Sequence, residues 1–464
     1  MNVSNIKSVY FIGAGGIGMS AIARYFLSQG KVVAGYDRTP SELTNRLVQE
    51  GAQIHYEENV DLIPSSCKIK EETLVVYTPA IPSEHQELAW FKEQGFEIQK
   101  RAQVLGTITR SAKALCVAGT HGKTTTSTML AHLMSGTPEE CNAFLGGIAK
   151  NYGTNYILSE ESPWVVIEAD EFDRSFLRLS PDVAVVTSCD PDHLDIYGTY
   201  EAVKEAFGQF IERIKPGGAL ILKKGVELAF DNPEITLYRY AYDEVADFYA
   251  TNIRLVGGGH YRFDLVLPDG VVEDCTLGIP GWVNIENAVA AVAAAWCAAR
   301  QEGVAFDAAR LKQALADFSG VKRRFEFYLN TPRQVYMDDY AHHPEELEAT
   351  ITSVRKMFPG RHLTAVFQPH LYTRTRDLYR EFAAALSHAD EVVLVPIYPA
   401  RELPIEGVGS EMIMDLVTVP CRICERECLA QDLGAATTDV VVSFGAGNID
   451  AYCAAIAAEL EKKA

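Results

Sequence analysis

The sequence predicts an α/β protein of about three domains, because its 464 residues correspond to roughly 150 residues per domain. Short apolar runs that are typical of buried strands alternate with helical stretches, and two of these runs lead directly into a glycine-rich turn and a helix. This order is typical of parallel, doubly wound sheets, in which ligands bind beyond the carboxyl ends of the strands. Hydrophobic residues make up 48% of the chain, enough for each domain to bury a core.

Composition argues against several classes of function. The 42 Lys and Arg residues against 62 Asp and Glu residues give a net charge of −20, which disfavours the broad basic face of a nucleic-acid-binding protein. The longest apolar run, residues 288–299, is shorter than the stretch of about 20 residues that spans a bilayer, and residues 1–7 lack the apolar core of a signal peptide. Ten scattered cysteines are typical of a reduced protein. We therefore expect a cytoplasmic protein with no nucleic-acid partner and no membrane insertion.

The first domain is predicted over residues 1–110. Residues 8–12 are expected to form a buried strand, followed by a glycine turn, a helix over residues 19–29 and strands over residues 31–36 and 74–77. Strand, helix and strand in this order predict a Rossmann-like parallel sheet.

The turn after the first strand matches G-x-G-x-x-G with Gly13, Gly15 and Gly18, and Asp37 ends the next strand about twenty residues later. Glycines at these positions let backbone N–H groups approach a pyrophosphate at the N-terminus of a helix. The loop alone leaves three interpretations open, namely NAD, another pyrophosphate ligand such as a UDP-sugar, or a turn that serves only packing.

The second domain, predicted over residues 111–319, begins with a strand at 114–118 and a second glycine-rich loop, G-T-H-G-K-T-T-T. The loop has the G-K-[ST] end of a P-loop, in which Lys123 reaches the β- and γ-phosphates and the Thr124 hydroxyl reaches Mg²⁺. Val117 stands where the longer P-loop motif has its first glycine, so this loop is shorter. The residues predict a P-loop NTPase-like domain that binds ATP.

Acidic residues follow two further predicted strands of this domain, residues 164–167 and 183–187. One acidic cluster covers residues 168–173 and the other covers residues 190–195. Because the carboxyl ends of parallel strands meet at one edge of a sheet, these carboxylates are expected close to the P-loop, where they can hold Mg²⁺ on ATP. A solvated acidic loop is the alternative. A helix over residues 287–300 is expected to close the domain.

The third domain is predicted over residues 320–464 and is again a Rossmann-like α/β unit. Its expected strands are residues 334–337, 363–367, 391–396 and 440–444, with helical stretches between them.

Together these features resemble the Mur ligases of peptidoglycan synthesis. The resemblance rests on the two glycine-rich loops in series, on E-A-D-E and D-H-x-D in the acidic clusters, and on four further motifs. These motifs are G-W-V-N-I-E-N at 281–287, K-R-R-F at 322–325, D-D-Y-A-H-H-P at 338–344 and Q-P-H-L-Y-T-R-T-R at 368–376. They follow the order of the family and cover the whole chain.

The resemblance implies ATP-dependent ligation of L-alanine to the lactyl carboxylate of UDP-N-acetylmuramate through an acyl phosphate. The products would be UDP-N-acetylmuramoyl-L-alanine, ADP and phosphate. One alternative is a recycling ligase that joins a murein tripeptide to the same UDP-sugar. More distant alternatives are an NAD-dependent oxidoreductase, which leaves the P-loop unexplained, and a nucleotide-gated scaffold without catalysis.

The resemblance also implies roles for individual residues. The catalytic residues would be Lys123, Glu168, His193, Arg324, Asp339, His342 and Arg374. The nucleotide would contact Gly119, Thr120, His121, Gly122, Lys123, Thr124, Thr125, Asn284, Asn287, Arg324 and Asp339. The UDP-sugar and alanine would contact Gly13, Gly15, Gly16, Ile17, Gly18, Asp37, Thr78, Tyr340, His342 and Arg374. One Mg²⁺ would be held by Thr124 and Glu168, and a second by His193.

Several positions depart from the family pattern. Val283 stands where a His beside the adenine is usual, Ser188 and Cys189 replace Asn-Ile, Leu371 replaces an Arg, and Asn448 replaces an Asp. None of these positions is expected to touch the P-loop.

Overall fold

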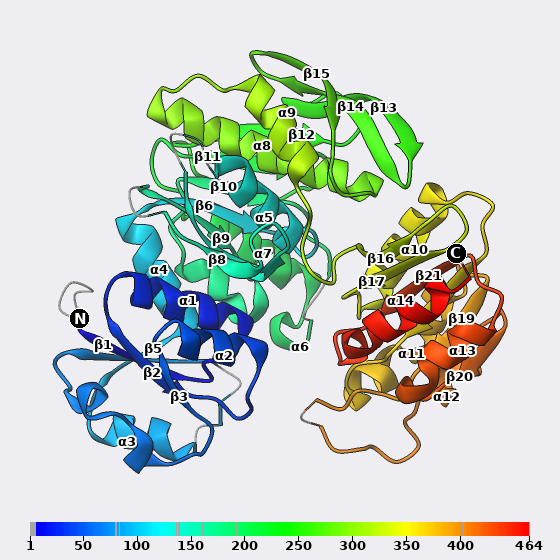
Figure 1. Ribbon diagram of the computed structural model, residues 1–464. Coiled ribbons are helices and arrows are strands. Elements are labelled where there is room, and N and C mark those ends of the chain that lie inside the picture. Colours follow the sequence, from blue (N-terminus) through cyan, green and yellow to red (C-terminus); the bar gives the residue numbers. More distant parts are fainter. Residues whose placement is uncertain are drawn as a thin grey trace. The chain divides into compact units, whose positions relative to one another are not determined.

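The computed structural model describes residues 6–78, 81–82, 84–135, 137, 140–159, 162–191, 194–400 and 402–463. The chain divides into two compact units (Figure 1). One comprises Met1–Thr251, Asp264–Cys275 and Glu286–Ser319, and the other comprises Asn252–Phe263, Thr276–Ile285 and Gly320–Ala464.

The first sheet has five parallel strands in the order β3-β2-β1-β4-β5. Its strands are β1 (Ser8–Ile12), β2 (Val32–Tyr36), β3 (Gln53–His55), β4 (Thr73–Tyr77) and β5 (Glu97–Lys100). The accompanying helices are α1 (Ile17–Ser28), α2 (Glu42–Gln49), α3 (Gln86–Glu93) and α4 (Arg101–Ser111). Alternate residues of β1 pack on opposite faces, since Val9 and Phe11 belong to one buried cluster and Tyr10 and Ile12 to another.

The second sheet has ten strands in the order β15-β14-β13-β12-β11-β10-β6-β9-β7-β8. Its central strands are β6 (Lys113–Ala118), β7 (Asn142–Ala149), β8 (Thr154–Ile157), β9 (Trp164–Glu168) and β10 (Val183–Val186). The others are β11 (Ala219–Lys223), β12 (Thr236–Ala241), β13 (Phe248–Gly257), β14 (His260–Leu267) and β15 (Gly270–Thr276). The helices are α5 (Lys123–Met134), α6 (Leu194–Tyr197), α7 (Tyr200–Ile211), α8 (Trp282–Glu302) and α9 (Ala308–Asp317).

Helix α8 begins five residues before the predicted start of the helix at residue 287. Its apolar centre, residues 288–299, is buried, whereas its first turn mixes buried and half-buried residues and gave a weaker apolar pattern. By length and composition α8 could cross a membrane, but 83% of its apolar window is buried inside the protein, as in the core helix of a globular domain.

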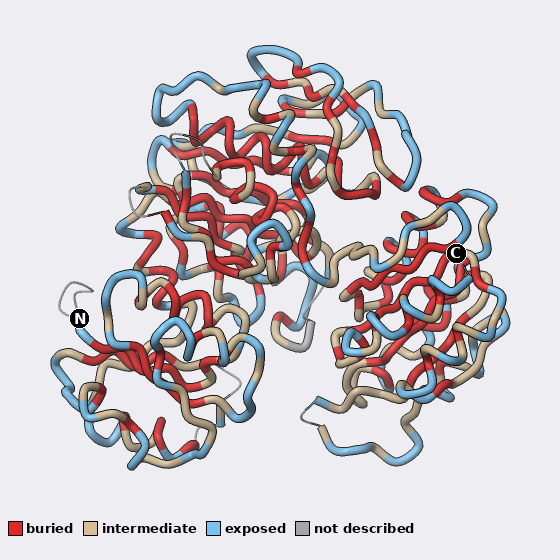
Figure 2. Tube along the Cα trace, viewed as in Figure 1, coloured by how far each residue is buried: buried red, intermediate tan, exposed pale blue. Residues whose placement is uncertain are grey.

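The first two sheets share one buried core. A single hydrophobic cluster includes Phe11 of β1 and Phe26 of α1 together with Phe144 of β7, Tyr156 of β8 and Ile167 of β9. Figure 2 shows buried residues in red along the strands and in parts of the helices. The N-terminal glycine loop and the P-loop therefore belong to one packed body.

The third sheet has six strands in the order β16-β17-β21-β18-β19-β20 (Figure 1). Its strands are β16 (Glu326–Asn330), β17 (Val335–Asp339), β18 (Leu363–Phe367), β19 (Glu391–Leu394), β20 (Cys421–Ile423) and β21 (Val440–Phe444). Its helices are α10 (Pro344–Met357), α11 (Tyr372–Leu386), α12 (Glu411–Met414), α13 (Leu429–Ala435) and α14 (Cys453–Glu461). Val442 of β21 packs with α10 and α11, whereas its neighbour Val441 packs with α13 and α14. Helices on both faces of largely parallel sheets confirm the predicted α/β fold class.

Candidate active site

The first glycine-rich loop connects β1 to α1. Gly13 has a φ of +90°, and a Cβ at this position would lie 2.8 Å from the Cγ2 atom of Thr78. The N–H of Gly15 donates to the Oδ2 atom of Asp37 at 2.6 Å. The N-cap residue of α1 is Gly16, which has no side chain to donate to or accept from the helix, and no side-chain cap is present there among the described residues. The loop thus gathers five of the predicted UDP-sugar residues, Gly13, Gly15, Gly16, Asp37 and Thr78, around an uncapped helix N-terminus.

The P-loop connects β6 to α5. Gly119 and Gly122 both have positive φ, at +140° and +78°, and a Cβ on Gly119 would lie 1.9 Å from the Oγ1 atom of Thr187. Only glycine fits this close approach. Thr124, which is buried, and Thr125 lie in the first turn of α5. The predicted strand–loop–helix context of the P-loop is therefore present.

The ammonium group of Lys123 is held within the loop. Its Nζ atom donates to the carbonyl of Gly119 at 2.6 Å and to the Oε1 atom of Glu171 at 2.8 Å. Glu171 is only 2% exposed. Burial by itself would lower the pKa of Lys123, but the carboxylates of Glu171, Asp170 and Glu168 raise it, so the side chain carries its charge at neutral pH.

Glu168 ends β9 beside the P-loop strand, since Val117 of β6 pairs with Glu168. The N–H of Gly146 on β7 donates to the Oε2 atom of Glu168 at 3.2 Å, and a Cβ on Gly146 would lie 2.3 Å from that oxygen. Carboxylate and hydroxyl oxygens are ligands that Mg²⁺ accepts, so Glu168 and Thr124 fit this ion chemically. His193 lies outside the described residues.

The described residues contain no group of three or more His, Cys, Asp and Glu side chains that could hold a metal ion by themselves. Mg²⁺ usually binds through one or two protein oxygens plus substrate phosphates. The donor set therefore fits an ion that arrives with a nucleotide.

The two predicted adenine-side asparagines lie at the start of α8. Asn287 accepts a hydrogen bond from the hydroxyl of Thr126 at 3.2 Å, and a Cβ on Gly122 would lie 2.8 Å from its Oδ1 atom. Asn287 therefore contacts the P-loop directly. Asn284 donates to the carbonyl of Pro280 at 2.6 Å, which fixes the turn before the helix.

In the second unit, the predicted residues follow the carboxyl ends of neighbouring strands. Strand β21 pairs with both β17 and β18, so that Phe444 is opposite Asp339 on one side and Phe367 on the other. The D-D-Y-A-H-H-P and Q-P-H-L-Y motifs continue from these strand ends. Ligands of open α/β sheets bind at such edges.

Arg324 and Asp339 lie at this edge of the third sheet, because Asp339 ends β17 and Arg324 precedes β16. The carboxylate of Asp339 is 4% exposed and accepts the backbone N–H groups of Phe325 and Ala341, both at 2.9 Å. Burial raises the pKa of Asp339, while Arg324 opposes that shift. The guanidinium of Arg324 lies over the ring of Tyr340, 5.2 Å from its centroid.

Aromatic rings connect the two motifs. The ring of His342 lies 5.4 Å from that of Tyr340 and 6.2 Å from that of His370, which stacks on Tyr398. Arg374 lies in the first turn of α11, and its Nη1 atom is buried with no hydrogen-bond partner among the described residues. A buried guanidinium N–H without a partner is suited to an incoming carboxylate.

Three family models match successive parts of the chain. They are described as "Mur ligase family, catalytic domain" over residues 8–113, "Mur ligase middle domain" over 117–295 and "Mur ligase, glutamate ligase domain" over 323–447. A UDP-N-acetylmuramate–L-alanine ligase of Parabacteroides distasonis is 55% identical over 452 residues, 97% of this chain and 96% of the relative. This chain belongs to the Mur ligase family. A relative of the same description from Phocaeicola vulgatus is 54% identical over the full length of both chains.

Solved structures agree with this Mur ligase fold. The crystal structure of a UDP-N-acetylmuramate–alanine ligase from Thermotoga maritima superposes with a TM-score of 0.79 at 25% identity, covering 98% of this chain and 100% of that one. A murein peptide ligase from Psychrobacter arcticus superposes with a TM-score of 0.67 at 20% identity, covering 98% of each chain, and so supports the fold alone.

One expectation about this Mur ligase is wrong. Ser188 was expected to lie away from the P-loop, but its Oγ atom accepts the N–H of His121 at 2.8 Å and lies 2.8 Å from the hydroxyl of Thr120. Strand β10 pairs with β6, and this pairing brings the residues after β10 against the loop after β6. The serine hydroxyl thus supports the P-loop backbone.

Sequence reasoning missed two residues of this Mur ligase. Glu171 lay in a noted acidic motif but was given no role, although it pairs with Lys123. Arg101 lies 3.2 Å from Asp170, and its Nη1 atom would lie 2.0 Å from a Cβ on Gly18. The arginine follows β5 on a different strand end, so its approach to the glycine loop could be found only from the fold.

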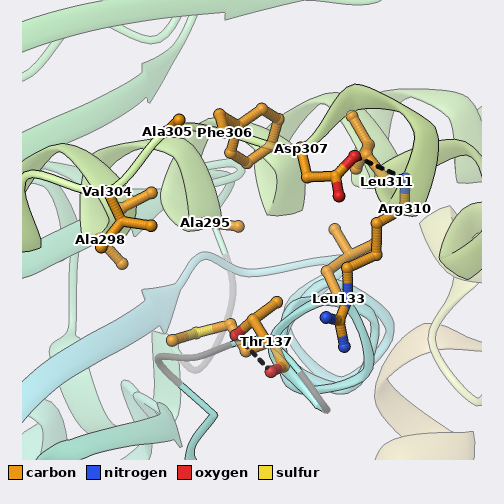
Figure 3. Close-up of a pocket in the computed structure, with 12 residues that line it drawn as sticks. Leu133, Thr137, Ala295, Ala298, Val304, Ala305, Phe306, Asp307, Arg310 and Leu311 are labelled. Carbon is orange, nitrogen blue, oxygen red and sulfur yellow. Dashed lines mark hydrogen bonds between the residues drawn. The ribbon is translucent and has the colours of Figure 1, made fainter.

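A separate pocket of about 280 Å³ lies at the far end of α5, between α8 and α9 (Figure 3). Its walls are mainly apolar and include Leu133 and Phe306. Its two charged residues support its own walls, because Arg310 donates to the carbonyl of Ser135 at 3.2 Å and Asp307 caps α9. We therefore do not assign the reaction to this pocket, and we place it at the carboxyl ends of the strands described above.

Proposed function

We propose that this Mur ligase joins L-alanine to the lactyl carboxylate of UDP-N-acetylmuramate with hydrolysis of ATP to ADP and phosphate, in peptidoglycan precursor synthesis. The observation that carries the proposal is the 55% identity, over nearly the whole chain, to a relative described as a ligase of these two substrates. The geometry agrees, because it offers a P-loop, a pyrophosphate-type glycine loop and an arginine whose buried Nη1 atom is suited to a carboxylate.

The chemistry explains why ATP is needed. A carboxylate is a poor acyl donor because its leaving group would be oxide, whereas an acyl phosphate can be attacked by an amine. Enzymes that transfer phosphoryl groups act mainly by positioning and by neutralising charge. Lys123 would contact the transferring phosphoryl group after leaving Glu171, and Arg324 would supply a second positive charge.

Mg²⁺ is proposed as the accompanying cation, with one ion held by Thr124 and Glu168 and a second held by His193. When bound, it would neutralise phosphate charge. Asn287, which contacts the P-loop, would meet the nucleotide together with Asn284 and Asp339.

The proposed substrate residues follow strands of the first sheet and of the third sheet. The UDP-sugar would bind at Gly13–Gly18 with Asp37 and Thr78. Alanine would bind near Tyr340 and His342, with its carboxylate on Arg374. We also propose that the chain has three domains, over residues 1–110, 111–319 and 320–464. We propose a cytoplasmic location, because ATP is supplied there.

The test is phosphate release from ATP with UDP-N-acetylmuramate and one amine at a time. We expect turnover with L-alanine and little with the murein tripeptide. Preference for the tripeptide would replace the proposal with a recycling ligase. Tight NAD binding, followed by nicotinamide fluorescence, would contradict the assignment of the first glycine loop.

A further inference from the structure

A buried polar cluster joins α1 to the β7–β8 hairpin. At its centre is Asn155 of β8, whose side chain is fully buried. Its Nδ2 atom donates to the carbonyl of Ile17 and, at 3.2 Å, to the hydroxyl of Ser20. Its Oδ1 atom accepts from Nη1 of Arg24 at 2.6 Å. The asparagine thus uses both ends of its amide on one helix.

The neighbouring charges determine which way this amide points. Arg24 is 7% exposed, and besides Asn155 it donates to Glu50 at 2.7 Å and to the hydroxyl of Thr154 at 3.2 Å. A guanidinium has only donors, so the group facing it must be the amide oxygen. The amide nitrogen is therefore directed at the Ile17 carbonyl.

Ile17 belongs to the G-G-I-G stretch of the first glycine loop, and 138 residues separate it from Asn155. The contact thus runs from the sheet that carries the P-loop to the loop proposed to hold the UDP-sugar. The core shared by α1, β7 and β8 makes this junction rigid, because Phe26, Phe144 and Tyr156 pack in one cluster.

The β7–β8 hairpin also contacts a residue of the proposed nucleotide site. Gly146 of β7 donates its N–H to Glu168, the proposed Mg²⁺ ligand. One strand of the hairpin therefore contacts Glu168 and the other contacts the first glycine loop. The β7–β8 hairpin therefore contacts both the Glu168 side of the nucleotide site and the first glycine loop. These two sites must be correctly placed for phosphoryl transfer to the sugar carboxylate.

We propose that Asn155 is a positioning residue for the UDP-sugar, which holds the first glycine loop in register with the P-loop sheet. The inference rests on the proposed function. Asn155 does not itself need to touch the substrate. Its loss would remove the hydrogen bond from the hairpin to the Ile17 carbonyl, which would keep the Ser20 hydroxyl of its own helix at 3.0 Å, and would leave Nη1 of Arg24 with the Thr154 hydroxyl. The loop would then lose the hydrogen bond that fixes it to the P-loop sheet.

The test compares Asn155→Ala with Arg46→Ala. Arg46 of α2 donates to the carbonyl of Gly153 and pairs with Glu42 of its own helix, so its polar contacts within the described residues reach the hairpin and not the glycine loop. For Asn155→Ala we expect a KM for UDP-N-acetylmuramate raised about tenfold, with the Kd for ATP changed less than about twofold. For Arg46→Ala both constants should change less than about twofold.

An equal rise in both variants would assign the effect to general docking of the hairpin and would overturn the inference, as would an unchanged KM in Asn155→Ala. If Asn155→Ala does not fold, Ser20→Ala removes the hydroxyl that accepts from Asn155 and that also donates to the Ile17 carbonyl at 3.0 Å, and it should raise the same KM about threefold. An unchanged KM in that variant then overturns the inference. A wild-type enzyme that does not turn over UDP-N-acetylmuramate with L-alanine would instead contradict the proposed function.

Discussion

The Nζ atom of Lys123 lies 2.8 Å from the Oε1 atom of Glu171, a carboxylate that is 2% exposed. The carbonyl of Gly119 accepts a second hydrogen bond from the same ammonium at 2.6 Å. A half-buried lysine is thus paired with a buried carboxylate that follows the neighbouring strand β9. For Lys123 to contact the γ-phosphate, it must exchange this carboxylate for the nucleotide.

Glu171→Gln removes the competing charge but keeps an oxygen that accepts a hydrogen bond. We expect the KM for ATP to fall about threefold to tenfold, while the KM for UDP-N-acetylmuramate stays the same. Asp173→Asn is the control, because Asp173 lies in the same acidic motif but is 46% exposed and pairs with Lys100 at 3.5 Å. A KM for ATP that is unchanged or higher in Glu171→Gln would contradict the exchange.

Lys123→Ala should abolish ligation and leave UDP-sugar binding nearly intact, because the lysine lies on the P-loop and not on the first glycine loop. Calorimetric titration with UDP-N-acetylmuramate alone checks this. The substitution also leaves Glu171 buried without its cation, which is destabilising. The double variant Lys123→Ala, Glu171→Gln controls for that loss. Binding of the UDP-sugar that weakens as much as turnover in both variants would refute the separate sites.

Gly15→Ala should raise the KM for UDP-N-acetylmuramate about tenfold and leave ATP affinity unchanged. The new Cβ would lie 2.8 Å from the Cγ2 atom of Thr44 and 2.9 Å from the Oδ2 atom of Asp37, so the loop must shift. Gly16→Ala is the matched control, since its nearest neighbouring atom lies 3.7 Å away. Equal effects of the two substitutions would show that the contact with Asp37 is not what matters.

Arg374→Ala should raise the KM for alanine about tenfold or more and leave ATP binding normal, because it removes a charge-assisted contact with a carboxylate. Arg376→Ala is the control, since Arg376 is 50% exposed and pairs with Asp377 at 2.7 Å. Steady-state kinetics at varied alanine concentration measure this KM in each variant. If the alanine KM of Arg374→Ala is that of the wild type, the alanine carboxylate binds elsewhere.

Stability at acid pH should depend on Glu346. Burial by itself would raise the pKa of Glu346, but the hydrogen bond and charge of His342, with Arg324, hold it well below its usual range. A carboxylate whose pKa is lowered by folding stabilises the protein above its unfolded pKa of about 4.3, and this contribution is lost as the pH falls. The difference in unfolding free energy between wild type and Glu346→Gln should therefore shrink from about pH 5 to about pH 3.

Denaturant unfolding at several pH values measures that difference. Glu345→Gln, an exposed position in the same turn, should show no comparable trend. A constant difference between wild type and Glu346→Gln would contradict the pairing with His342.

Much of this fold could be predicted, because apolar runs and glycine-rich turns depend on residues that are close together in the sequence. The apolar run at residues 8–12 is β1, and the run at 440–444 is β21, because buried parallel strands need continuous apolar residues. Strands β13 to β15 were not predicted, since β14, at His260–Leu267, alternates buried and more exposed residues and carries no continuous apolar run.

The sequence by itself determined the α/β class, the two glycine loops and the motifs that resemble the Mur ligases, because each depends on residues close together in the chain. The tertiary structure alone decided that Glu171 pairs with Lys123, that Ser188 supports the P-loop, and that Asn155 contacts Ile17. These contacts join residues that are 48, 67 and 138 positions apart. The first two exist because parallel strands bring distant loops to one edge of a sheet, and the third exists because α1 packs on the β7–β8 hairpin in a shared core. Strand order and this packing depend on the whole core rather than on any local pattern.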